Sequence, residues 1–270
     1  MRSMRAEFKK LLRGLCVGIS KSLQTSDRVI ILYYHSIDER KGEKFYLKTP
    51  PDIFIEQMRL LKNNYEVIPL GELIKCIKHR KQINKSIVIT FDDGFKDNYT
   101  VVYPILYRYD LPATFFITTG FIGKRGYMDW RDLKELKESG FEIGSHTVTH
   151  PRLSKLPKLK IDEELRISKE VLETKLDEEI DLFAAPYGDS KSVNDDVIEL
   201  SKRYYDCCCL TQGFFGIDPN NVDIYRLKRC PAMPDFSEFK QTVEGYAGLW
   251  LWLYEKLIVL KNEKLKLTEI

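Results

Sequence analysis

The nine-residue stretch 86–94, with the sequence SIVITFDDG, decides the fold class of this chain. Its first six residues are mostly β-branched, a composition that favours a β-strand. Asp92 and Asp93 follow directly, and adjacent residues leave a strand on opposite sides, so the two carboxylates can have different functions. Gly94 permits a sharp turn, because glycine adopts positive φ angles without steric cost. The stretch therefore predicts a strand that ends in two carboxylates, although DDG alone is also a common turn sequence.

Short apolar runs alternate with segments of helical periodicity on both sides of this stretch, from Arg28 onward. Strands are predicted at residues 29–34, 65–68, 86–91, 113–118, 141–144, 181–185 and 205–210, and helices at 51–64, 70–77, 98–108, 130–139, 160–176 and 193–202. This alternation is typical of βα units around a parallel sheet. About seven such strands in one domain predict an α/β fold with a closed or nearly closed barrel, in which chemistry belongs at the C-terminal ends of strands.

The composition is that of a soluble globular protein with one large domain. Of the 270 residues, 43% are hydrophobic and 31% are charged, and a chain of this length can bury a sizeable core. The formal net charge of +3 gives no support for nucleic-acid binding. Among the six cysteines, Cys207, Cys208 and Cys209 are consecutive, and no C-x-x-C pair exists. This usage fits buried thiols in a reducing compartment, so we expect a cytoplasmic protein.

Segments at both ends are predicted to be additions to a domain at residues 28–235. Residues 1–27 combine a basic run with a short apolar stretch, which indicates a basic amphipathic helix and is too short for a signal peptide. Residues 236–270 are predicted to form a helical tail that contains Trp250 and Trp252. Either segment can pack on the domain or lie on a membrane surface, so peripheral membrane association is the alternative to a purely cytoplasmic location.

A second motif, HTVTH at residues 146–150, places two histidines four residues apart. They can converge on one metal ion if the segment makes a helical turn or a tight loop, since each imidazole offers a neutral nitrogen. The two threonines between them are expected to be structural. Solvent-facing or core histidines are the alternative for this segment alone. Together with Asp93, however, His146 and His150 give three protein ligands and leave one coordination position open, which is typical of a catalytic metal site.

Three motifs together resemble those of a known family. They are TFDDG at residues 90–94, SHTVTH at 145–150 and PYG at 186–188, in this order. The combination is similar to that of the polysaccharide deacetylases with a NodB homology domain, carbohydrate esterase family 4, and the resemblance covers residues 29–233. It implies a distorted (β/α) barrel and metal-dependent hydrolysis of the acetamide of an N-acetylated sugar, with release of acetate. The substrate would contain N-acetylhexosamine, as a polysaccharide, a glycan precursor, or a lipid- or nucleotide-linked sugar.

The resemblance also implies roles for individual residues. Asp93, His146 and His150 match the metal ligands, and the ion is usually zinc in this family. Asp92 matches the general base. The backbone N–H of Tyr187 matches the donor that completes the oxyanion site.

Two positions depart from the common family pattern. Ala184 stands where the family usually has an arginine that orients the general base, and no histidine follows His150 to serve as the general acid. Arg226 and Arg229 are the candidates to replace the missing arginine. Two alternatives stay open: a deformylase or other amidase on the same fold, and a catalytically silent carbohydrate-binding module, which the two departures suggest.

His35 is the candidate for the missing general acid. It ends the first predicted strand in the sequence LYYHS, which resembles the Y-H motif of the poly-β-1,6-N-acetylglucosamine deacetylase subgroup. The resemblance implies a histidine near the metal, and an unperturbed histidine pKa of about 6.5 suits proton donation near neutral pH. The alternative is that His35 only packs or forms a hydrogen bond beside the site.

Overall fold

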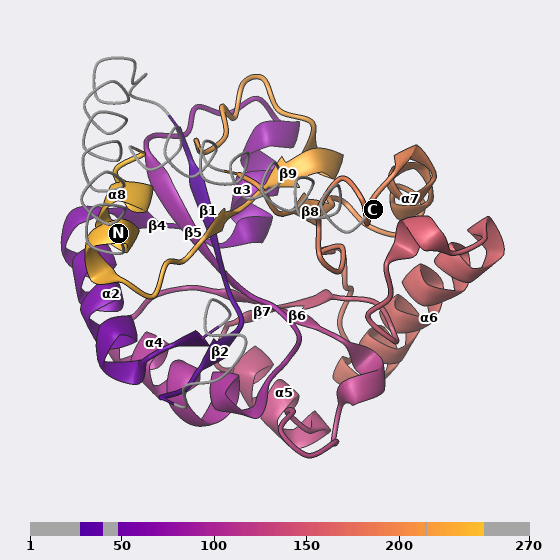
Figure 1. Ribbon diagram of the computed structural model, residues 1–270, viewed down its shortest axis with the longest axis horizontal. Coiled ribbons are helices and arrows are strands. Elements are labelled where there is room, and N and C mark those ends of the chain that lie inside the picture. The colour runs from indigo at the N-terminus through magenta and orange to yellow at the C-terminus, as the bar shows by residue number, and fades with distance from the viewer. Residues whose placement is uncertain (1–27, 40–47, 214, 246–270) are drawn as a thin grey trace, which may run out of the picture.

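The computed structural model describes residues 28–39, 48–213 and 215–245 of the chain (Figure 1). The predicted N-terminal extension at 1–27, and the tryptophans of the predicted C-terminal tail, lie outside the described residues. Within these ranges, no helix is both long and apolar enough to cross a membrane.

A parallel sheet forms the centre of the molecule. Its strand order is β10-β1-β5-β6-β7, and β4 also pairs with β5. The bounds are Ile30–Tyr34 for β1, Glu66–Val67 for β4, Ser86–Phe91 for β5, Thr114–Ile117 for β6, Glu142–Ser145 for β7 and Cys230–Pro231 for β10. All six residues of β5 are buried, and its predicted bounds are confirmed. The α/β fold with parallel strands is therefore confirmed.

Further parallel pairings continue the sheet beyond β7 and return it to β1. Ser145 at the end of β7 pairs with Phe183, and Ala184 pairs with Cys209. Strand β8 (Cys209–Leu210) then pairs with β9 (Leu227–Lys228), and the chain passes through Arg229 into β10, which pairs with β1. Within the described residues, pairing thus runs in a circuit through β1, β5, β6, β7, residues 183–184, β8 and β9–β10. This is a distorted barrel of short strands.

One strand of this circuit differs from the predicted set. The predicted strand at 65–68 forms only β4, which pairs with the first two residues of β5 and lies outside the circuit. Its place is taken by residues 227–231, for which no strand was predicted. The predicted strand at 205–210 is shortened to β8, and Cys207, Cys208 and Cys209 are buried as expected.

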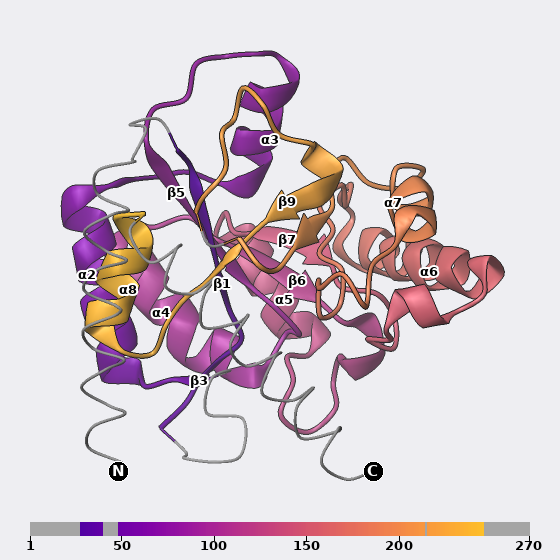
Figure 2. The same ribbon diagram turned by 45° about the horizontal axis from the view of Figure 1, so that its top comes forward.

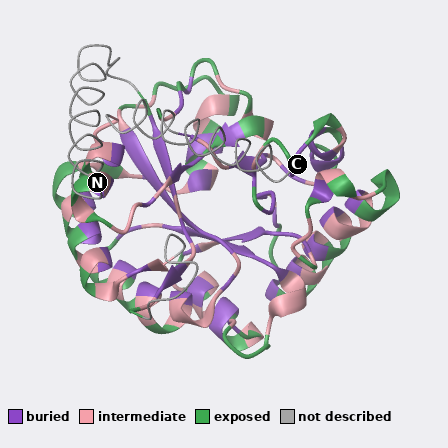
Figure 3. Ribbon diagram, in the orientation of Figure 1, coloured by how far each residue is buried: buried purple, intermediate pink, exposed green. Residues whose placement is uncertain are grey.

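Helices cover the outside of the strands (Figures 1 and 2). They are α2 (Pro51–Asn64), α3 (Leu70–Lys78), α4 (Tyr103–Tyr109), α5 (Trp130–Glu138), α6 (Lys158–Leu176), α7 (Asp195–Ser201) and α8 (Phe236–Val243). Short elements connect them: β2 (Ser36–Ile37), β3 (Lys48–Thr49), a π-helical turn η2 (Asn98–Val102), and the 3₁₀ turns η3 (Thr119–Phe121), η4 (Leu153–Lys155) and η5 (Ile224–Arg226). The strands β1, β5, β6 and β7 are largely buried, and the helices are exposed on their outer faces (Figure 3). Phe239 and Val243 of α8 belong to the main core.

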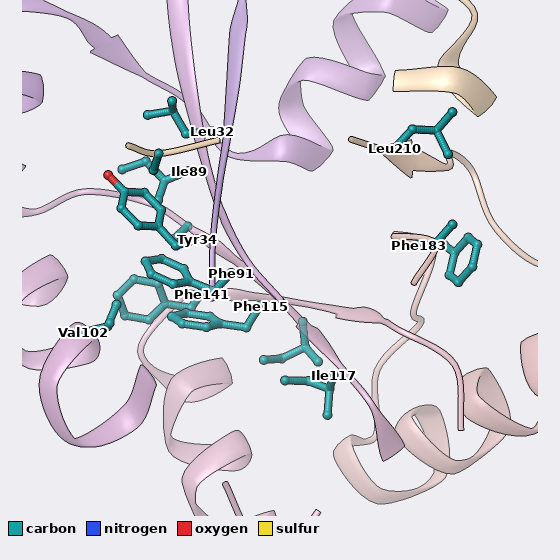
Figure 4. Packing of buried hydrophobic residues seen from close by; sticks show 14 of the residues in the cluster. Leu32, Tyr34, Ile89, Phe91, Val102, Phe115, Ile117, Phe141, Phe183 and Leu210 are labelled. Atoms are coloured by element: carbon teal, nitrogen blue, oxygen red, sulfur yellow. The ribbon is translucent and has the colours of Figure 1, made fainter. Parts of the chain in front are cut away.

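Stacked aromatic rings hold the C-terminal half of β5 in place (Figure 4). The Phe91 ring stacks on Phe115 of β6 and on Tyr34 of β1, with centroid separations of 5.0 and 5.1 Å. Phe141 packs edge-on against Phe115. Each such pair contributes about 0.5–1.5 kcal/mol beyond its burial. Because Phe91 is the last residue of β5, this stack fixes the point from which Asp92 and Asp93 leave the strand.

Candidate functional site

The paired aspartates lie where β5 ends, as the sequence predicts. The backbone N–H of Asp92 donates to the Tyr34 carbonyl at 2.9 Å, which continues the β1–β5 pairing by one residue. Asp93 and Gly94 then adopt φ angles of 73° and 77°. The left-handed turn at a non-glycine residue is unusual, and it directs the side chain of Asp93 away from that of Asp92. Asp92 is 3% exposed.

The two histidines leave β7 in a tight turn. The backbone N–H of His146 donates to the Ile117 carbonyl at 2.9 Å, beside the end of β6. Thr147 and His150 have φ angles of 67° and 58°, and the N–H of His150 donates to Thr147 Oγ1 at 3.1 Å. The turn brings the two imidazole centroids to 5.0 Å. The expected convergence of the histidines is therefore present, and Thr147 has the structural role expected of it.

Asp93, His146 and His150 come together as a cluster able to hold a metal ion. One ligand atom from each lies within 4.8 Å of the others. Asp93 Oδ1 is 3.2 Å from His150 Nε2 and 3.5 Å from His146 Nε2. That oxygen is buried and accepts no hydrogen bond. A buried carboxylate oxygen without a donor is costly, so the cluster fits a bound cation.

The second ring nitrogen of His146 supports the same assignment. Nδ1 lies 2.6 Å from the Ala184 carbonyl. A carbonyl can only accept, so Nδ1 carries the proton and Nε2 presents its lone pair towards Asp93. Metal-binding histidines commonly have such a backbone partner, which fixes the tautomer.

Charge and burial set the protonation states of the cluster. Burial lowers the pKa of His146 to about 4, against the partly opposing charges of Asp92 and Asp93. Burial raises the pKa of the Asp93 carboxyl, but the imidazoles of His150 and His146 outweigh burial and lower it below its usual value. Near neutral pH the cluster therefore offers a carboxylate and an imidazole of His146 in the forms that bind a metal.

Asp92 has an arginine as its partner. Arg229, fully buried at the junction of β9 and β10, donates from Nη1 and Nη2 to the two carboxylate oxygens of Asp92 at 2.7 and 2.8 Å. Nη1 also donates to Thr90 Oγ1, and Nε donates to the Leu210 carbonyl. Burial raises the pKa of the Asp92 carboxyl, but the positive charge of Arg229 outweighs burial and holds that pKa well below its usual range.

His35 and Tyr187 lie around this centre. His35 follows β1, and its carbonyl accepts from Asn98 Nδ2 at 2.8 Å. Its electrostatic interaction with Asp92 and Asp93 contributes to lowering the pKa of both carboxyls. Tyr187 has a φ of 62° and is 46% exposed.

The Tyr187 ring is held between two side chains. It packs against the His150 ring at a centroid distance of 4.9 Å, and the guanidinium of Arg152 lies 4.2 Å from its centroid. Arg152 also contacts Asp189 and Ser192, in the segment that follows Tyr187. The Pro-Tyr-Gly segment and the histidine turn are therefore joined by side-chain contacts.

Comparisons with known proteins place this geometry in a family. The family model for polysaccharide deacetylase matches residues 79–205. Deacetylase PplD of Streptococcus pyogenes, solved in complex with acetate, superimposes with a TM-score of 0.73 at 28% identity, over 81% of this chain and 99% of that one. BA0330 of Bacillus anthracis, described as a polysaccharide deacetylase, is 30% identical with a TM-score of 0.68, over 82% of this chain and 68% of its own. The chain belongs to the polysaccharide deacetylase family.

A relative of named substrate is also similar. The poly-β-1,6-N-acetyl-D-glucosamine N-deacetylase of Staphylococcus aureus is 30% identical over 191 residues, which are 64% of this chain and 63% of the relative. The chain thus spans less than two thirds of that enzyme's length. The subgroup resemblance carried by the motif around His35 agrees with this match.

Within this polysaccharide deacetylase, the arginine that contacts Asp92 is Arg229, whereas Ala184 stands at the position expected from the family pattern. Both candidates from the sequence are present in the structure, and only Arg229 reaches Asp92. Arg226 instead pairs with Asp195 at 2.6 Å and lies 3.6 Å from Asp223. The Ala184 carbonyl still contributes to the site through His146.

Sequence reasoning missed two residues that contact the site. Arg152 directly follows the histidine motif as part of the sequence THPR, and Glu164 was included in a charged helix at 160–176 without a role of its own. The position of Arg152, two residues after His150, is a signal that could have been noticed. Glu164 had no comparable signal, because contact with the histidine turn depends on how α6 packs.

Proposed function

We propose that this protein is a metal-dependent N-deacetylase that hydrolyses the acetamide of an N-acetylated sugar and releases acetate. The observation that carries the proposal is the convergence of Asp93, His146 and His150 beside the Asp92–Arg229 pair. A polysaccharide that contains N-acetylglucosamine is the favoured substrate class, on the strength of the similar S. aureus enzyme. A glycan precursor or a lipid- or nucleotide-linked sugar carries the same reactive group.

Asp93, His146 and His150 would hold the divalent ion, for which zinc is favoured by two imidazole ligands and one carboxylate. A divalent cation bound there supplies a Lewis acid that polarises an amide carbonyl and acidifies nearby water enough for a weakly basic carboxylate to deprotonate it.

Asp92 is the proposed general base. Its carboxylate stays ionised because of the charge of Arg229, and the two-pronged contact from that side chain holds one orientation. Arg229 itself is buried and acts only through Asp92, so it is a positioning residue. This arrangement fixes where a proton is accepted and favours a single geometry of attack.

His35 and Tyr187 complete the proposed mechanism. His35 would protonate the leaving amine, since it follows the end of β1 and interacts electrostatically with both carboxylates. The backbone N–H of Tyr187 would donate to the oxyanion of the tetrahedral intermediate. Contacts of the Tyr187 ring with His150 and Arg152 support the position of this residue.

Metal content and acetate release, measured on the same preparations, test this function. We expect about one divalent ion per chain and acetate release from oligomers of β-1,6-linked N-acetylglucosamine. Both should be lost in Asp93→Ala and retained in His79→Ala, since His79 is exposed beyond α3. A bound ion with acetate release only from a lipid- or nucleotide-linked sugar would change the substrate class. Absence of ion binding in zinc-supplemented wild-type protein would overturn the proposal and favour a binding module.

The favoured location is the cytoplasm, with peripheral membrane contact as the alternative. The cysteines of the described residues, Cys76, Cys207, Cys208, Cys209 and Cys230, are free thiols, which supports a reducing compartment. Co-sedimentation with lipid vesicles, compared between the full chain and a chain shortened after Ala247, separates the two. Equal co-sedimentation of both proteins would show that the tail does not contribute to membrane binding.

A further inference from the structure

Glu164 lies against the turn that carries the two metal-binding histidines. From α6, its Oε2 accepts the backbone N–H groups of Val148 and Thr149 at 2.8 and 2.9 Å. Its Oε1 accepts the Thr149 hydroxyl at 2.6 Å. A single carboxylate thus takes three hydrogen bonds from the segment between His146 and His150, although it touches neither histidine.

The turn needs such an acceptor because of its own conformation. Thr147 and His150 have left-handed backbone angles, which residues other than glycine keep only where the surroundings hold them. Within the described residues, Glu164 is the acceptor found for the N–H groups of Val148 and Thr149, and no backbone carbonyl accepts them. Backbone donors without partners are costly, and charge-assisted bonds to a carboxylate are stronger than neutral ones.

The helix α6 contacts the same segment at a second point. Ser168, one helical turn after Glu164, lies with its Oγ 2.8 Å from that of Ser145 at the end of β7. The Ser168 hydroxyl is also bonded within α6, to the Glu164 carbonyl at 2.7 Å. One face of α6 therefore holds the chain both just before His146 and just before His150.

We propose that Glu164 is a positioning residue for the metal site, which organises the histidine turn before the ion binds. This inference rests on the metal ligands of the proposed function, and adds to them a residue outside the ligand set. Without Glu164 the turn would lose three hydrogen bonds, so part of the free energy of ion binding would be spent on ordering it. The consequence is weaker metal binding, with chemistry largely recovered once the site is saturated.

Metal affinity of the apoprotein is the first test, measured by competition between the protein and a chromogenic chelator for Zn²⁺. Glu164→Ala should lower the affinity about 10- to 100-fold, the usual effect of removing a residue that orients metal ligands. Glu164→Gln should retain most of it, since an amide oxygen can accept the two N–H groups and its NH₂ can donate to the Thr149 hydroxyl. Glu163→Ala is the matched control, because Glu163 forms a partly exposed ion pair with Lys160 of the same helix.

Amide hydrogen exchange in the metal-free protein is the second test. The amides of Val148 and Thr149 should exchange faster in Glu164→Ala than in wild type, while those of β5 stay protected. Thr149→Val removes only the hydroxyl contact and should give a smaller loss of metal affinity, which keeps the inference testable if Glu164→Ala does not fold. Wild-type affinity in both Glu164→Ala and Thr149→Val would overturn the inference. That result is separate from the failure of the proposed function, which is a wild-type protein that binds no ion when zinc is supplied.

Discussion

Arg229 holds both carboxylate oxygens of Asp92 from a position 137 residues further along the chain. Arg229 lies between β9 and β10, the strands that return the pairing circuit to β1. Its side chain therefore links the last strands of the barrel to the end of β5. Both side chains are almost wholly buried, at 0% and 4% exposure. A buried pair of this kind is a poor source of net stability, but removing one partner leaves an uncompensated charge.

Replacement of Arg229 by methionine should therefore impair stability and chemistry together. We expect the free energy of unfolding to fall by about 3–5 kcal/mol and kcat to fall by about 100-fold or more, because Asp92 loses its orientation. Urea unfolding and initial rates of acetate release measure the two effects. Arg226→Met is the matched control, since Arg226 is 42% exposed and surface ion pairs contribute about 0–1 kcal/mol. A kcat within twofold of wild type in Arg229→Met would contradict the assigned role.

Local signals explain what the sequence could predict. Strand β5 and its two aspartates were predictable because six successive residues and the following glycine specify them without help from the rest of the chain. The strands at residues 227–231 and the role of Arg229 between them were not predictable, since two-residue strands carry no periodicity. Arg226 and Arg229 are equally basic in sequence, and only the closure of the barrel decides which of them faces Asp92. Glu164 was missed for the same reason, because the contact of α6 with the histidine turn is long-range.

Substitution should distinguish the roles of the two adjacent aspartates, with Asp92 as the general base and Asp93 as a metal ligand. Asp92→Asn should lower acetate release about 100- to 10,000-fold, the range for loss of a general base, while the protein keeps its metal ion. Asp93→Asn should lose the ion itself. Metal analysis after gel filtration, paired with rate measurements, distinguishes them. An Asp92→Asn variant that lost its metal would show that both carboxylates are ligands.

Acid should destabilise the metal-free protein through His146. Its folded pKa of about 4 lies below the unfolded value of about 6.5, so the unfolded chain binds more protons between these values. The free energy of unfolding therefore rises as pH increases from about 4 to 6.5, by about 3 kcal/mol at most from this residue. The lowered pKa of Asp92 acts in the same direction, at lower pH.

Urea midpoints of protein kept in chelator, measured between about pH 4.5 and 7, report this dependence. In His146→Asn the slope should flatten, because the titrating group is gone. His79→Asn, at an exposed position, should keep the wild-type slope. A wild-type midpoint that does not change over this range would contradict the neutral, buried state of His146.

His35 should control the alkaline side of the pH profile. A general acid must hold its proton in order to protonate the leaving amine, so kcat falls at alkaline pH. In His35→Gln we expect a lower kcat whose alkaline decline has disappeared, with metal content unchanged because His35 is outside the ligand cluster. His79→Gln controls for the loss of a histidine elsewhere. If His35→Gln kept the wild-type turnover at every pH, another group would have to protonate the leaving amine.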